Sequence, residues 1–66
     1  MLTGVQLADI IKKRGMFKSE AARRCGYTPG RITQFLKGDK ITKGAAIRLI
    51  AGLKITEEEL SQQKTN

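Results

Sequence analysis

The fold is constrained most by the stretch KSEAARRCGYTPGRITQFLK at positions 18–37, which predicts two short helices joined by a tight turn. Ala22 is small enough to let two helices approach closely, and Gly26 can adopt the left-handed conformation that ends a helix. After the turn, Ile32 and Phe35 recur at helical spacing and give the second helix one apolar face. The remaining positions of that helix are polar or very small. The stretch therefore predicts a helix pair that buries its second helix on one side only.

Apolar spacing and turn signals elsewhere predict three further short helices. We expect helices over about 4–13, 20–25, 29–37, 43–51 and 57–62. The expected N-caps of the first four are Thr3, Ser19, Thr28 and Thr42, and glycines at 15, 26, 38 and 52 are expected to end them. Met16 and Phe17 should form an apolar connector packed on the core, and 53–55 an extended link. The predicted class is all-α: a compact five-helix bundle in one domain over 1–63, with 64–66 as a frayed tail.

The charge balance narrows the class of partner. The 66 residues carry 13 basic and 6 acidic side chains, for a formal net charge of +7. Such an excess on a small surface attracts a polyanion, with general solubility as the less favoured explanation. Its distribution says more, because three of the six acids cluster at Glu57–Glu59 while the middle of the chain is basic.

Several classes of function are set aside by what the sequence contains. There is no His, and the lone Cys25 is expected to be a small core residue, so neither a metal site nor an intrachain disulfide is predicted. Asp9, Glu20 and Asp39 fall on different expected elements, which leaves paired-carboxylate catalysis without a site. We therefore expect neither an enzyme nor a cofactor nor a small-molecule substrate. No signal peptide or membrane-spanning run is predicted, and the expected compartment is the cytoplasm.

On these residues the chain resembles the Cro/repressor-type helix-turn-helix family of phage and bacterial regulators. The segment TPGRITQFLKG is similar to the recognition helix of small lambdoid phage Cro proteins, several of which share the Thr-Pro-Gly opening. The resemblance covers about residues 4–60. It implies a lambda-repressor-like DNA-binding domain that acts as a transcriptional repressor in a bacterial host. Double-stranded DNA is the implied partner, bound by a homodimer through two half-sites.

The resemblance also implies base contacts from the second helix of the pair. Two positions that normally reach base edges are here Pro29 and Gly30, which carry no polar side chain. Readout is therefore expected from Gln34, which can bond adenine in two places, and from Arg31, which contacts either a guanine edge or a phosphate. The full expected set of base contacts is Thr28, Pro29, Arg31, Thr33 and Gln34.

Backbone phosphates are expected to meet residues on either side of that helix. The family usually has Gln at the first position of the motif, where this chain has Lys18, a point charge that can still hold a phosphate. The expected phosphate contacts are Lys18, Ser19, Arg23, Lys37, Lys40 and Lys43.

Two questions stay open at this stage. Leu53, Ile55 and Leu60 either close the core, which we favour, or form part of a twofold interface. The same fold also serves antitoxins and phage activators, although an antitoxin usually carries a toxin-binding segment and the ending QQKTN is short for one. A protein-interaction helical bundle without DNA binding is the remaining alternative.

Overall fold

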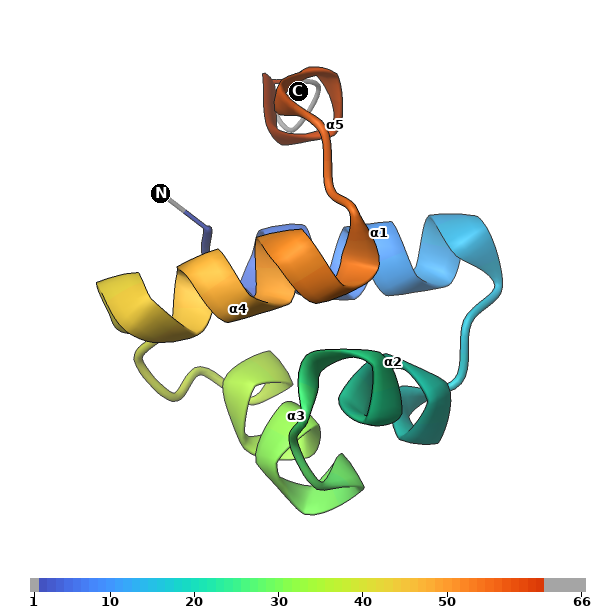
Figure 1. The fold of residues 1–66 in the computed structure, drawn as a ribbon, viewed down its shortest axis with the longest axis vertical. Coiled ribbons are helices and arrows are strands. Elements are labelled where there is room, and N and C mark those ends of the chain that lie inside the picture. Colours follow the sequence, from blue (N-terminus) through green and yellow to red (C-terminus); the bar gives the residue numbers. More distant parts are fainter. Residues whose placement is uncertain (1, 62–66) are drawn as a thin grey trace.

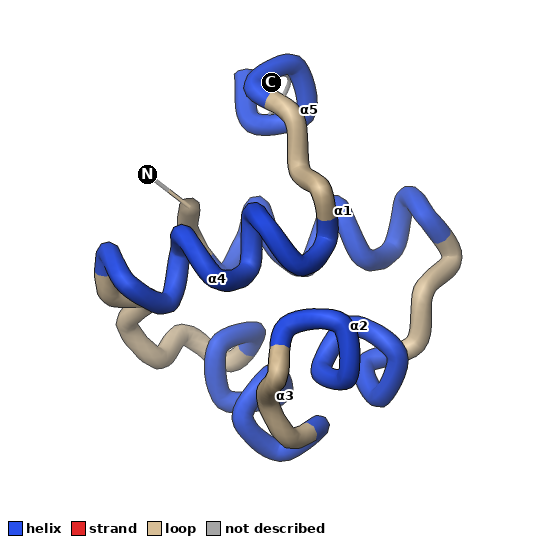
Figure 2. Tube along the Cα trace, viewed as in Figure 1, coloured by secondary structure: helices blue, strands red, loops and turns tan. Residues whose placement is uncertain are grey.

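A computed structural model describes residues 2–61 of the chain. This part folds into five α-helices and contains no strand (Figures 1 and 2). The helices are α1 (Gly4–Arg14), α2 (Lys18–Cys25), α3 (Pro29–Leu36), α4 (Lys43–Leu53) and α5 (Glu57–Ser61). The predicted all-α class and the order of the five helices are confirmed.

The helices enclose one core. α2 packs against both α3 and α4, and α1 packs against α3. In Figure 1, α2 and α3 occupy the end of the molecule opposite to α5. Because α2 is held by two neighbours, the position of α3 is tied to the rest of the bundle.

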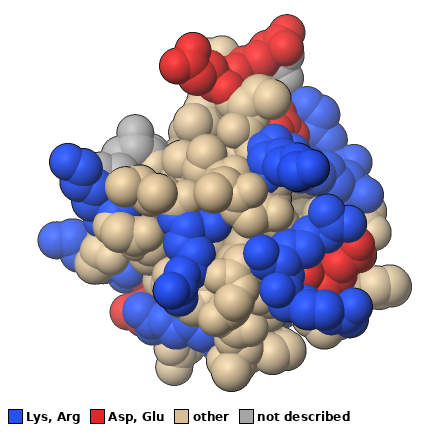
Figure 3. Space-filling model, viewed as in Figure 1, with Lys and Arg blue, Asp and Glu red and all other residues tan. Residues whose placement is uncertain are grey.

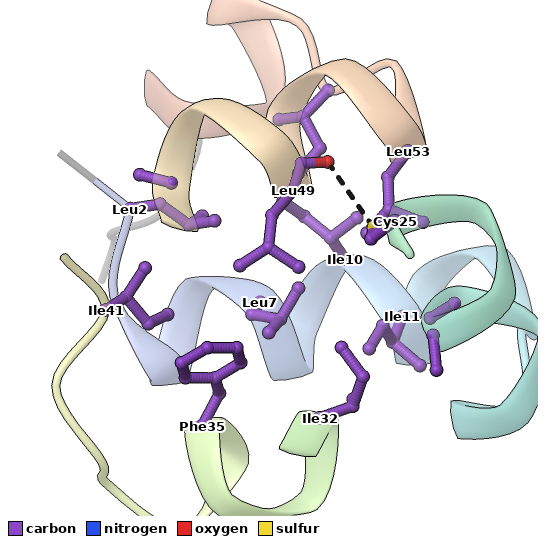
Figure 4. Packing of buried hydrophobic residues seen from close by; sticks show 14 residues of the cluster. Leu2, Leu7, Ile10, Ile11, Cys25, Ile32, Phe35, Ile41, Leu49 and Leu53 are labelled. Atoms are coloured by element: carbon purple, nitrogen blue, oxygen red, sulfur yellow. Dashed lines mark hydrogen bonds between the residues drawn. The ribbon is translucent and has the colours of Figure 1, made fainter. Parts of the chain in front are cut away.

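The core is apolar and takes buried side chains from every helix except α5, and from Leu2, Ile41 and Ile55 outside the helices (Figure 4). Ile32 and Phe35 are fully buried, as predicted for the inner face of α3. Cys25 is also buried, as predicted, with its thiol 4.0 Å from the carbonyl oxygen of Leu49. Burial raises the pKa of the Cys25 thiol, against an opposing effect of the Arg48 charge. The thiol is therefore protonated at neutral pH and acts as a small apolar side chain.

Side-chain caps begin three of the helices where the sequence predicted them. Thr3 forms a capping box with Gln6, while Thr28 and Thr42 accept hydrogen bonds from backbone N–H groups in the first turns of α3 and α4. Gly26 has φ 77°, so the predicted left-handed end of α2 is confirmed.

The start of α2 differs from the prediction. Ser19 was expected as the N-cap, but α2 begins at Lys18 and Phe17 occupies the cap position without a side-chain hydrogen bond. Met16, the residue before this cap position, packs against the core as predicted and so fixes the direction in which the chain enters α2. Phe17 then turns outward and is 77% exposed, so its predicted burial is wrong.

The end of α4 is also corrected. Gly52 does not end this helix, which continues to Leu53 and is followed by Lys54 in the left-handed conformation, φ 53°. Position 52 needs a glycine because α4 packs closely on α2 there. A Cβ atom at this position would lie 2.7 Å from the carbonyl oxygen of Arg24 and 2.9 Å from Cys25. Gly52 is therefore a point of close approach between α4 and α2. The predicted extended link over 53–55 is wrong at Leu53, which is helical.

α5 is fastened to the bundle mainly by polar contacts. The Arg14 guanidinium bonds the Glu59 carboxylate at 2.6 Å and donates to the carbonyl oxygens of Leu53 and Lys54 at the end of α4. Gln6 donates to the carbonyl oxygen of Leu60, which packs partly against the core. The predicted end of this helix at position 62 and the predicted tail at 64–66 lie outside the described residues.

Candidate nucleic-acid interface

The turn between α2 and α3 is held by backbone hydrogen bonds and by ring packing. The Tyr27 N–H donates to the carbonyl oxygen of Ala22 at 2.9 Å. The Tyr27 ring packs edge-on against the Phe35 ring, with the ring centroids 5.5 Å apart. The Arg48 guanidinium also lies over the Tyr27 ring, 5.1 Å from its centroid. These contacts fix the direction in which α3 leaves the turn.

Opposite its buried face, α3 presents a surface that we call the outer face: Pro29, Gly30, Thr33, Gln34 and Lys37. These positions lie three and four residues apart, so they share one side of the helix. All are exposed except Thr33, which is partly buried and donates from its hydroxyl to the carbonyl oxygen of Pro29 at 3.0 Å. The outer face thus combines small residues with two long polar side chains.

Thr28, at the N-cap, is exposed but already engaged. Its side-chain oxygen accepts the Arg31 N–H at 3.2 Å. The hydroxyl hydrogen remains the group that Thr28 can offer to a phosphate or a base.

Arg31 lies on the flank of α3 and not on the outer face. One nitrogen, Nη1, donates to Asp39 Oδ2 at 2.7 Å and to Gln34 Oε1 at 2.9 Å. The guanidinium carbon sits 4.4 Å from the centroid of the Phe35 ring. The structure therefore brings together two of the predicted base-contact residues, Arg31 and Gln34, and joins them to a carboxylate.

The contact of Asp39 with Arg31 could not be predicted from the sequence. Asp39 lies in the loop between α3 and α4, eight residues after Arg31, which is a separation that no helical spacing links. Only the fold of the loop behind Gly38, with φ 117°, brings the carboxylate back to the flank of α3. The signal available in the sequence was an acidic residue inside an otherwise basic segment.

The predicted phosphate-contact residues are all exposed. They lie at the start of α2, on its outer side, at the end of α3 and along the path into α4: Lys18, Ser19, Arg23, Lys37, Lys40 and Lys43. Arg24 pairs with Glu20 one turn earlier at 3.0 Å. In Figure 3, basic side chains cover much of the face below α5, whereas acidic side chains gather over α5 itself. Acidic side chains are thus most concentrated at α5, and basic side chains lie both beside this helix and below it.

The three residues considered for a twofold protein interface differ in how far they are buried. Leu53 and Ile55 are 1% and 7% exposed and belong to the monomer's core, as favoured from the sequence. Leu60 is only partly buried. Of the three, Leu60 alone retains surface for a second chain.

Among residues 2–61, no helix has the length and apolar character needed to cross a bilayer. No protein-family model matches the chain, and no curated protein or solved structure is significantly similar to it.

Proposed function

We propose that residues 18–37 form a helix-turn-helix of the Cro/repressor type and that the protein is a sequence-specific DNA-binding transcriptional regulator. The observation that carries the proposal is the asymmetry of α3. Its inner face is buried through Ile32 and Phe35, while its outer face is polar or small and projects from the molecule. A helix of this kind, held by a second helix across a tight turn, can enter the major groove.

Charge supports the same proposal. Exposed lysines and arginines lie in α2, at the end of α3 and in the loop that leads into α4, and the formal net charge is +7. Phosphate neutralisation would then supply much of the affinity and make it strongly dependent on salt. Selectivity would come from the outer face.

In this proposal two copies bind two half-sites about 34 Å apart, one turn of the DNA helix. The eight residues of α3 offer few base contacts, so a single copy would read too short a sequence to select an operator. Occupation of an operator that overlaps a promoter would exclude polymerase, which gives repression.

The proposal is tested by selecting from random duplex DNA at near-physiological salt and sequencing what is retained. We expect a short motif, repeated in inverted orientation about one helical turn apart. Retention without any motif, lost as salt rises, would leave only a non-specific basic protein. A reporter with the selected site then separates repression from activation.

Gln34→Ala tests whether the outer face of α3 reads a base. Gln34 is exposed, so the fold should be retained. We expect a loss of roughly 1–3 kcal/mol of discrimination at one base position. An unchanged motif in the selection would show that Gln34 is not a base contact.

A further inference from the structure

Arg31, Gln34 and Asp39 form a hydrogen-bonded chain beside the outer face of α3. The Asp39 carboxylate and the Gln34 amide oxygen both bond the same nitrogen of Arg31, at 2.7 and 2.9 Å. Each Nη nitrogen of arginine carries two hydrogens, so this nitrogen is fully used. Stacking of the guanidinium at 4.4 Å over the Phe35 ring adds a third restraint on the arginine.

The hydrogen bonds among Arg31, Gln34 and Asp39 fix the orientation of the Gln34 amide. An arginine can only donate, so the group that faces Arg31 must be the amide oxygen. The amide nitrogen, with its two donor hydrogens, is then the end left for a partner. Of the donors and acceptors that a glutamine side chain offers, the outer face presents mainly donors here.

The bases differ in what they offer to such a group. A bidentate contact with adenine needs an acceptor for the N6 amino group as well as a donor for N7. At Gln34 one of the two lone pairs of the acceptor oxygen is taken by a cationic guanidinium, whose positive charge also disfavours an incoming amino group. Guanine offers two acceptors, O6 and N7, and suits a side chain that presents mainly donors.

We propose that Arg31 and Asp39 are positioning residues that make Gln34 a donor and give it a preference for guanine over adenine. This inference rests on the proposed function, and it replaces the adenine contact expected from the sequence. Arg31 then affects base preference through Gln34 and does not itself contact a base. Asp39 holds the positive charge of Arg31 away from the phosphates.

The Arg31–Asp39 pair is accessible, with side chains 40% and 52% exposed. An exposed ion pair adds little to folding stability, so either residue can be replaced without loss of the fold. Its effect should therefore appear in base preference and in salt dependence, which a purely structural contact would not move.

The experiment repeats the random-duplex selection with five proteins: the original chain, Gln34→Ala, Arg31→Ala, Asp39→Ala and Asp9→Ala. The position that loses its preference in Gln34→Ala identifies the base that Gln34 reads. Asp9 is an exposed carboxylate on α1, so Asp9→Ala is a control for loss of one negative charge. Circular dichroism checks that each variant is folded.

We expect guanine at the Gln34 position for the original chain. Arg31→Ala frees the amide oxygen, so the ratio of guanine to adenine should fall by roughly fivefold to a hundredfold. Asp39→Ala releases Arg31 to a phosphate and should steepen the dependence of log K on log salt by about 0.9, with Asp9→Ala leaving the base preference unchanged.

Four results would overturn the inference in whole or in part. Adenine at the Gln34 position, or guanine that persists unchanged in Arg31→Ala, would contradict the donor role while leaving the proposed DNA reader intact. If the salt dependence of binding is the same in Asp39→Ala and Asp9→Ala, Asp39 does not position Arg31 and is no part of the inference. Failure of the original chain to select any motif would instead remove the proposed function, and the inference with it.

Discussion

Two arginine–carboxylate pairs of this small protein join a helix to a segment outside it, one beside α5 and one beside α3. Their shortest N–O distances are similar, 2.6 Å for Arg14–Glu59 and 2.7 Å for Arg31–Asp39. Their surroundings are not. The Arg14 and Glu59 side chains are 27% and 17% exposed, against 40% and 52% for the second pair.

The other partners of the two arginines sharpen the contrast. Arg14 also donates to the carbonyl oxygens of Leu53 and Lys54, which α4 leaves without helical partners. Arg31 instead bonds the side chain of Gln34, an exposed residue on the outer face. An arginine–carboxylate pair thus fastens α5 to the bundle at one end of the molecule, whereas the second pair fixes the amide of an exposed side chain, Gln34, at the other.

The largest effect is expected where α4 meets α2. Gly52→Ala should destabilise the protein by about 1–3 kcal/mol, because the added Cβ would collide with the backbone of α2. Gly44→Ala, in the same helix with open space around it, should be neutral or stabilise by up to about 1 kcal/mol. Urea unfolding measures both. Equal effects of the two substitutions would contradict the close contact at Gly52.

The comparison of the two pairs is tested by Arg14→Ala and Arg31→Ala. We expect Arg14→Ala to lower the free energy of unfolding by about 1–2 kcal/mol, since it leaves a carboxylate and two carbonyl oxygens without their donor. Arg31→Ala should change it by less than about 0.5 kcal/mol. Thermal unfolding measures which variant loses more stability. A larger loss in Arg31→Ala than in Arg14→Ala would contradict the difference drawn between the two pairs.

A smaller effect is expected on DNA affinity from single phosphate contacts. Lys40→Ala should weaken binding to all sequences alike and reduce the salt slope by about 0.9. Lys12→Ala, which replaces another exposed lysine, on α1, is the control and should change the slope less. Titrations at several salt concentrations provide the slopes. Weakening confined to one sequence would place Lys40 on a base.

The smallest effect concerns pH. The hydrogen bond from Arg14 holds the pKa of the Glu59 carboxyl below its usual 4.5. A carboxyl whose pKa is lower in the folded state contributes stability above its unfolded pKa and loses it as the pH falls. We therefore expect the stability of the original chain to decline more than that of Glu59→Gln as the pH falls below 4.5. Parallel curves from thermal unfolding would show that Glu59 contributes nothing.

Much of the fold followed from local signals in the sequence. Threonine caps and the left-handed Gly26 depend on neighbours within four residues, so Thr3, Thr28 and Thr42 were predicted correctly as caps. Gly52 was misread because its role depends on α2, which is remote in the sequence. Phe17 was misread because hydrophobicity alone does not say on which side of the chain a connector residue will fall.

The candidate site divides in the same way. The polar outer face of α3 followed from helical spacing around Ile32 and Phe35. The coupling of Gln34 to Arg31 and Asp39 did not, because it depends on how the loop after Gly38 returns to the helix. The identity of a side chain was readable from the sequence, whereas the atoms it leaves free for a partner were not.

The central claim is that α3 and its flanks meet DNA while the α5 end does not. It is tested most directly by recording ¹⁵N–¹H spectra of the protein as a duplex carrying the selected site is added at physiological salt. We expect large shifts for the backbone amides of Thr28, Gly30 to Gln34 and Lys40, with those of Glu57–Ser61 nearly unchanged. Shifts centred on α5, or spread evenly over the described residues, would contradict it.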